Sequence, residues 1–310
     1  MSSMRAPRRF AAAALLGLAS PAVLGLGGAK PDPWDLPAPD PAEISIAITA
    51  SKREYVIRLV DRLPDRALLP ERVEPPATED EKKALRECRD LLAAGRGTEA
   101  ETAAKELLRL NPALHDARAI LGKALLAQKK TAEAVAALRE SLIGNRRNPE
   151  AWKDLEEAAA ALGKKVVRPA LQPPSWLLET KRNEAEIGVV APDEGGPAYS
   201  WIYYAMGRAF YRFEGPFDAA YPGRTYVPTF REHLHGVGAV VVAAEGDRKD
   251  GEKLPADLAR LLAEKKAKTI VPFVFFAMYA DPVPAEPEKD FAVLRPRLEK
   301  HFDEKILVKK

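Results

Sequence analysis

The sequence predicts a mainly α-helical protein, and three observations lead to this fold class. Between residues 81 and 149 the sequence repeats with a step of 34 positions, which is typical of units made of two helices. After residue 176, apolar residues recur at helical spacing. The chain has 310 residues, of which 46% are hydrophobic and 30% charged, so it is long enough to bury a globular core.

The N-terminus has the order of a secretory signal peptide, which we predict over residues 1–29. Three arginines precede an uncharged stretch rich in Ala and Leu, and small residues follow before Lys30. We therefore expect an exported protein, periplasmic or secreted, that is cleaved near Lys30. Two alternatives remain open. In the first, the stretch would be an uncleaved membrane anchor, although its many small residues make it only marginally apolar for a membrane span. In the second, Arg8-Arg9-Phe10 would belong to a twin-arginine export signal.

Removal of this segment would change the charge of the protein. The whole chain has 48 Lys and Arg against 45 Asp and Glu, and residues 1–29 contain three arginines and no acid. The mature chain would therefore carry 45 of each and no net charge. A neutral chain gives no support for nucleic acid or an anionic membrane as a partner, and we expect no stable membrane insertion after cleavage.

Residues 30–80 are predicted to form a proline-rich spacer. The run from residue 30 to 42 contains proline at every second to fourth position and is expected to be extended. Two short apolar runs, 44–48 and 55–57, flank a polar stretch, and their alternation indicates a short N-terminal β-hairpin. A second proline-rich run, 63–80, leads into the repeats.

The repeats are predicted over residues 81–165. The run 91–94 (LLAA) returns one step later as 125–128 (LLAQ). A third step places Trp152 and Leu155 on the first helix of another unit, but prolines follow before a second helix can form. The pattern predicts about two and a half helical hairpins. Each hairpin has an apolar face that it cannot bury alone, so neighbouring units stack.

This pattern resembles the tetratricopeptide repeat family. The second unit matches the large and small packing positions of that family at Leu121, Gly122, Leu125, Ala134, Leu138 and Ser141. In the first unit Cys88 stands where glycine is usual. The resemblance implies a helical stack whose concave groove, lined by the first helix of each unit, binds a protein or peptide. The alternative is an alanine-rich helical bundle with accidental similarity.

The resemblance also implies which residues would face a ligand in the groove. The corresponding positions fall on Arg89, Lys123 and Lys153, of which the first two are separated by one full step of the repeat. Three cations along one groove of an otherwise neutral protein would favour an acidic peptide or a C-terminal carboxylate.

Residues 176–310 are predicted to form a mainly helical C-terminal domain, for which we find no family resemblance. Aromatic residues between 199 and 211 predict one amphipathic helix. Residues 229–244 also favour a helix, with a strand as the alternative. The remaining expected elements are a helix beginning near Pro255, a buried apolar segment over 273–279, and a final amphipathic helix interrupted or restarted at Pro296.

Few side chains suggest catalysis. His233 and His235 have the spacing of the His-x-His pairs that bind zinc in some hydrolases, but on a helix their rings would lie about 200° apart. Cys88 is the only cysteine, so no intrachain disulfide can form, and packing is its expected role. We expect no metal and no cofactor. An adaptor is therefore favoured, and the alternative is an exported enzyme, such as a hydrolase, with its active site in the C-terminal region.

Overall fold

The computed structural model describes residues 34–38, 54–60, 77–181, 184–190, 200–223, 226, 229–246, 253–278 and 288–310. Over these residues the protein is mainly helical, as predicted, with two small sheets. The predicted signal peptide lies outside the described residues. Within them, none of the helices is both long and apolar enough to span a membrane.

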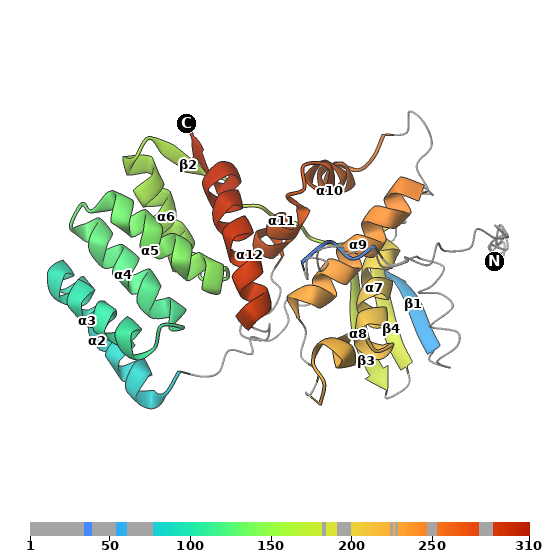
Figure 1. Cartoon of the computed structure of the whole chain (residues 1–310), viewed down its shortest axis with the longest axis horizontal. Helices are drawn as coiled ribbons and strands as arrows, with labels where there is room; N and C mark the ends of the chain where they lie inside the picture. Colours follow the sequence, from blue (N-terminus) through green and yellow to red (C-terminus); the bar gives the residue numbers. More distant parts are fainter. Residues whose placement is uncertain are drawn as a thin grey trace, which may run out of the picture. The chain divides into compact units, whose positions relative to one another are not determined.

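The repeat region is a row of helices joined by short turns (Figure 1). They are α2 (Glu79–Ala93), α3 (Gly97–Leu110), α4 (His115–Ala127), α5 (Thr131–Gly144) and α6 (Pro149–Ala161). Each helix packs against the next one in the chain. The first residues of α3 and α5 are 34 positions apart, and so are those of α4 and α6. The period of the sequence is thus also a period of the structure.

The ends of the first, third and fifth helices of this row repeat in detail. Gly95, Lys129 and Gly163, each one step of the repeat from the next, have left-handed φ angles of 73°, 61° and 68° just after α2, α4 and α6. The amides of Gly95 and the residue after it donate to carbonyls in the last turn of α2 at 3.0 and 2.9 Å, and the same two bonds, at 2.9 and 3.0 Å, close α4. This arrangement satisfies carbonyls that a helix end leaves free, and it reverses the chain. At the end of α6 the amide of Gly163 makes the first of these bonds, to Ala160 at 3.1 Å, so all three helices end in a left-handed turn.

After α6 the described chain continues as a strand and not as a second helix, in agreement with the predicted half unit. This strand, β2 (Lys164–Val166), pairs antiparallel with β5 (Leu307–Lys309) near the end of the chain. Helix α12 (Glu288–His301), which precedes the π-helical turn η3 (Phe302–Ile306), contacts α5. Arg139 of α5 binds Asp303 at 3.2 Å, and Arg295 of α12 binds Glu140. These contacts cover the end of the repeats.

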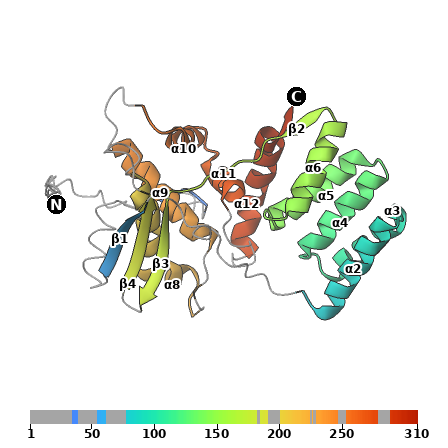
Figure 2. The same ribbon diagram turned by 180° about the vertical axis from the view of Figure 1, so that it is seen from behind.

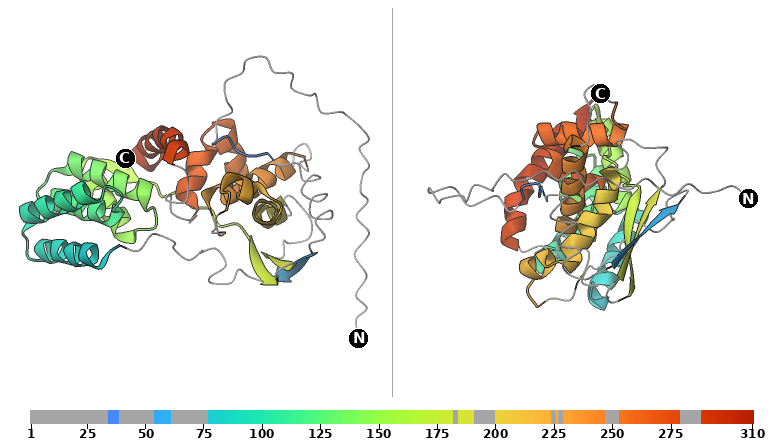
Figure 3. Two further views of the ribbon diagram at one scale, coloured as in Figure 1. Left: turned by 60° about the horizontal axis from the view of Figure 1, so that its bottom comes forward. Right: turned by 90° about the vertical axis from the view of Figure 1, so that its right-hand side faces the viewer.

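The other sheet joins distant parts of the chain. Its strands are β1 (Glu54–Val60), β3 (Ser175–Lys181) and β4 (Glu184–Val190), in the order β1-β4-β3. The second apolar run of the predicted N-terminal hairpin is therefore a strand, but it pairs in parallel with β4. The first run, 44–48, lies outside the described residues. Helix α7 (Ile202–Phe213) packs on β3 and β4, as Figures 2 and 3 show.

The C-terminal region contains β3 and β4, which the sequence did not predict, besides its expected helices. The helices after α7 are α8 (Pro216–Ala220), α9 (Phe230–Gly246), α10 (Ala256–Lys266) and α11 (Ile270–Ala277). The region predicted over 229–244 is a helix, not the alternative strand, and α11 is buried throughout. Helix α12 continues through Pro296, so the predicted interruption is wrong. Leu294 and Leu298 on either side are fully buried, and their burial outweighs the cost of the proline.

The largest buried cluster joins α5 and α6 of the repeats to α9, α11 and α12. It also contains Trp34, from the segment predicted to be an extended spacer. The Trp34 side chain is fully buried, its indole N–H donates to the carbonyl of Asp290, and its ring centroid is 5.6 Å from that of Phe230. The Arg231 guanidinium lies 4.4 Å from the ring. The spacer is therefore anchored in the core at this residue.

Candidate functional site

A groove crosses three helices of the repeat region and encloses a cavity of about 260 Å³. We call it the repeat groove and define it by the residues that line it. Helices α2, α4 and α6 supply these residues, with one cap residue before α6. They are Arg89, Leu92, Ala93, Asp116, Ala119, Ile120, Lys123, Asn148, Glu150 and Asp154.

The lining of the repeat groove follows the period of the repeats. Equivalent positions on successive helices are Arg89 and Lys123, then Asp116 and Glu150, then Ile120 and Asp154. Between the charged groups, Ala119 and Ile120 are buried and Leu92 is half-buried, so the floor is apolar. A surface with apolar floor and charged rim is suited to holding a peptide segment, because it offers both buried area and orienting polar groups.

Two of the three predicted cations, Arg89 and Lys123, line the repeat groove. Lys153 does not, because the position on α6 that is equivalent to Arg89 and Lys123 is Glu157, four positions further on. The groove also contains three acids, which together with the two cations give it a formal charge of −1. Of the three expected cations, Lys153 thus lies outside the repeat groove, and the lining is of mixed charge.

Hydrogen bonds fix part of the rim. The cap residue Asn148 accepts from the amide of Ala151 at 3.0 Å, and its side-chain amide donates to Asp116 at 3.5 Å. On the other side, the Arg89 guanidinium lies 3.9 Å from the Asp116 carboxylate. Asp116 thus contacts partners from both α2 and the start of α6.

Asp154, unlike Asp116, has no partner for its carboxylate among the described residues. Its side chain is only 7% exposed, and it makes no hydrogen bond to any described residue. Burial raises the pKa of its carboxyl group, while the charge of Lys123 acts in the opposite direction. Most of the residue is covered, while its carboxylate oxygens keep contact with the open groove.

The packing beneath the groove involves the residues singled out by the repeat pattern. A Cβ atom on Gly122 would lie 2.6 Å from Cγ of Leu138 and 3.4 Å from the carbonyl oxygen of Ala134, so α4 and α5 approach closely there. Ala134, Leu138 and Leu125 are buried. Leu121 is half-buried and packs on the cluster around Leu85 and Cys88. These contacts hold the helices that carry the groove residues.

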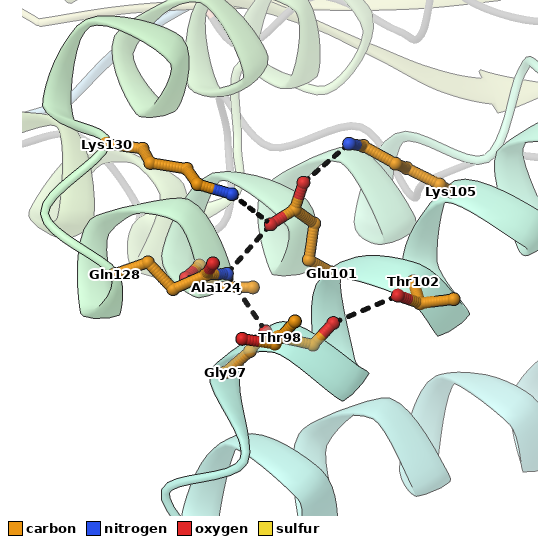
Figure 4. Close-up of polar contacts among 8 residues, drawn as sticks. All are labelled: Gly97, Thr98, Glu101, Thr102, Lys105, Ala124, Gln128 and Lys130. Atoms are coloured by element: carbon orange, nitrogen blue, oxygen red, sulfur yellow. Dashed lines mark hydrogen bonds and ion pairs between the residues drawn. The ribbon is translucent and has the colours of Figure 1, made fainter.

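A polar cluster around Glu101 links successive units (Figure 4). The Glu101 carboxylate, on α3, accepts from Lys105 on the same helix, from Gln128 at 2.8 Å and from Lys130 at 2.9 Å. The last two belong to the turn between α4 and α5. Hydrogen bonds from Lys105, Lys130 and Gln128 lower the pKa of Glu101 to about 2. The cluster joins the first unit to the second.

Cys88 is buried among apolar side chains, including Leu85 and Ala104. Burial raises the pKa of its thiol. A protonated, inaccessible thiol is a poor nucleophile, so the surroundings fit a packing residue.

The two candidate metal ligands lie on α9 and contact different residues. The ring nitrogen Nδ1 of His233 is 2.5 Å from the hydroxyl of Tyr204, and the ring centroid of His235 is 4.7 Å from that of Tyr211. Burial lowers the pKa of His233 well below its ordinary value and that of His235 to about 4. Among the described residues, no group of three His, Cys, Asp or Glu side chains could hold a metal ion.

Sequence reasoning missed a buried ion pair next to these histidines. Arg208 of α7 donates to Glu232 of α9 at 2.7 Å, and the hydroxyl of Tyr226 donates to the same carboxylate at 2.5 Å. Burial opposes the charge of Arg208, but Glu232 outweighs it and raises the pKa of the guanidinium. The helices are close here, because a Cβ on Gly236 would lie 2.7 Å from Tyr204. The pair satisfies two buried charges at a tight helix crossing.

A second cavity, of about 400 Å³, lies beside the anchored segment 34–38. Its polar lining residues are Asp35, Tyr211, Arg231 and His235. Arg231 is already held by Asp290 at 2.7 Å and by the ring of Trp34. No arrangement of nucleophile, base and orienting group is present among these four side chains.

No protein-family model, no curated protein and no solved structure matches this chain.

Proposed function

We propose that this protein is an exported adaptor whose tetratricopeptide-like repeats bind a protein or peptide in the repeat groove. The observation that carries the proposal is the repetition of the lining. Equivalent residues of successive units on α2, α4 and α6 supply the rim and floor of one groove. Stacked helical units with equivalent residues on one face are the arrangement by which repeat proteins build extended binding surfaces.

Two further features support the repeat assignment. The left-handed turns at Gly95, Lys129 and Gly163 keep the same step as the packing positions. The close approach of Gly122 to Leu138 and Ala134 has the large and small pattern of the family. The enzyme alternative is less well supported, because the titratable groups of α7 and α9 described above are buried and paired or packed on aromatic rings.

Export is part of the proposal, and it is supported by the order of arginines, apolar stretch and small residues at the N-terminus. Mass spectrometry of the exported protein should give a chain that begins near Lys30. A chain that retains residues 1–29 in a membrane fraction would instead favour the anchor.

The binding proposal is tested by capture from the exported fraction with matched charge changes. The double variant Arg89→Glu and Lys123→Glu reverses both cations of the repeat groove. The control, Arg86→Glu and Lys153→Glu, makes the same change at exposed sites of α2 and α6 outside the groove. The set of captured proteins should change with the first variant, because the charge of the groove changes, and stay the same with the control, both variants being folded by circular dichroism. Equal capture by both would place binding outside the groove.

A further inference from the structure

We infer that the repeat groove recognises a basic side chain of its partner, a lysine or arginine, whose cationic group binds the carboxylate of Asp154. The inference rests on the proposed function, because it names the chemistry of the ligand at the same groove. It reverses the acidic preference expected from the sequence.

Asp154 is buried and has no hydrogen-bond partner in the described part of the protein. Its side chain is more than nine-tenths buried and lines the repeat groove, yet it makes no hydrogen bond to any described residue. Asp116, in contrast, contacts both Arg89 and Asn148. Glu150, the third acid of the groove, is exposed to water, so Asp154 is the one buried carboxylate of the lining whose contacts are left to a ligand. Charge-assisted hydrogen bonds from an ammonium or guanidinium group are the strongest contacts that such a carboxylate can make.

The charged residues around Asp154 favour a positive ligand. The negative charges of Glu150 and Glu157 on α6 raise the pKa of Asp154. The positive charges of Lys123 on α4 and Lys153 on α6 lower this pKa. Lys123 forms no ion pair with Asp154, although both residues are described, so it does not neutralise the carboxylate by contact. With Asp116, Glu150 and Asp154 in the lining against two cations, the groove attracts a positive group more than a negative one.

The apolar floor beside Asp154 suits a long side chain with a charged end. Asp154 occupies the position on α6 that is equivalent to Ile120 on α4, so it follows directly on the apolar floor. A lysine or arginine side chain is a long alkyl stem with a charged end. The stem can lie on Ile120 and Ala119 while the charged end meets Asp154 at the α6 end of the groove. A short cation would leave the floor uncovered.

A random peptide library displayed on phage tests the inference with the purified protein. Peptides selected by the unchanged protein should be enriched in lysine or arginine. A synthetic peptide from this selection should bind about tenfold or more weakly to Asp154→Asn, which keeps the shape of the side chain and removes its charge. Glu156→Gln is the control, since Glu156 is exposed on the same helix and does not line the groove. This variant should bind the peptide as the unchanged protein does.

A second measurement does not depend on the folding of the variant. Replacement of the peptide's arginine by citrulline, or acetylation of its lysine, should cause a similar loss of affinity to the unchanged protein. Selected peptides without basic residues, or equal binding by Asp154→Asn, would overturn the inference and leave the adaptor function in place. Failure of any peptide to bind would count against the adaptor function itself.

Discussion

The repeat helices α2–α6 and the C-terminal region are held together by contacts of different range along the chain. In the repeats each helix packs on its neighbour in sequence, and equivalent features return with every unit. In the C-terminal region the decisive contacts join distant residues: β1 pairs with β4, β2 pairs with β5, and Trp34 bonds to Asp290. A repeating region can be extended or shortened by whole units, whereas a region closed by distant contacts depends on each of them.

The charged groups of the two regions also differ in their exposure to solvent. In the Glu101 cluster of the repeats the carboxylate is only 9% exposed, but its lysine partners are 59% and 41% exposed, and the cluster links neighbouring units. The Arg208–Glu232 pair is inside the C-terminal region, where it has no water to replace a lost partner. The lysines of the Glu101 cluster therefore keep contact with solvent, whereas both members of the Arg208–Glu232 pair have lost it.

The most sensitive test of this difference is Trp34→Ala. It removes a fully buried side chain that connects the N-terminal segment to α9 and α12, so we expect a loss of about 3–5 kcal/mol in the free energy of unfolding. Urea denaturation measures it. Val293→Ala, at an apolar residue of α12 that is 46% exposed, is the control and should change stability by less than about 0.5 kcal/mol. Similar midpoints for the two variants would mean that segment 34–38 is not part of the cooperative core.

Within the repeats, Gly122→Leu should lower the free energy of unfolding by about 1–3 kcal/mol, since the added atoms would collide with Leu138 and separate α4 from α5. Thermal unfolding gives the comparison with Ala136→Leu, the same kind of enlargement at an exposed site of α5, which should have little effect. If Gly122→Leu melts with the unchanged protein, the close helix pair does not exist.

Glu101→Gln should cost about 1–2 kcal/mol, because it weakens three hydrogen bonds to one carboxylate, two of them from lysines that remain partly solvated. The control is Glu99→Gln on the same helix, whose partner Arg96 is exposed, and it should leave the urea midpoint unchanged.

The pH dependence of this effect has a defined sign. The pKa of Glu101 is lowered from 4.5 to about 2, so its contribution is complete above pH 4.5 and disappears as the pH falls towards 2. The difference in stability between Glu101→Gln and the unchanged protein should shrink over this window. A difference that stays constant from pH 6 to pH 2 would show that the carboxylate charge is not responsible.

These regions also differ in how far their sequence predicts them. Helices α2–α6 follow from a local period, because the same residues meet at every step. The strand partners of β1 and β3 do not, since nothing in residues 54–60 specifies pairing with the distant segment 184–190. In the groove, Lys153 looked like a third cation because it is adjacent to Trp152, but one position on a helix turns a side chain by about 100°. Nothing in the sequence marks Asp154, the next residue, as a groove residue, and it is buried.

The smallest expected effect concerns two prolines, one in each region. Pro296 lies inside α12, where it cannot donate the helical hydrogen bond, and burial of Leu294 and Leu298 keeps the helix continuous. Pro296→Ala should therefore raise the free energy of unfolding by about 1 kcal/mol, the restored bond being partly offset by a freer unfolded chain. Pro149 begins α6, where its amide would need no partner, so Pro149→Ala should give no gain. Both residues are exposed, which removes packing from the comparison. Guanidinium denaturation of the two variants resolves a difference of this size. An equal gain in the free energy of unfolding for Pro149→Ala and Pro296→Ala would mean that both prolines act only through the unfolded state.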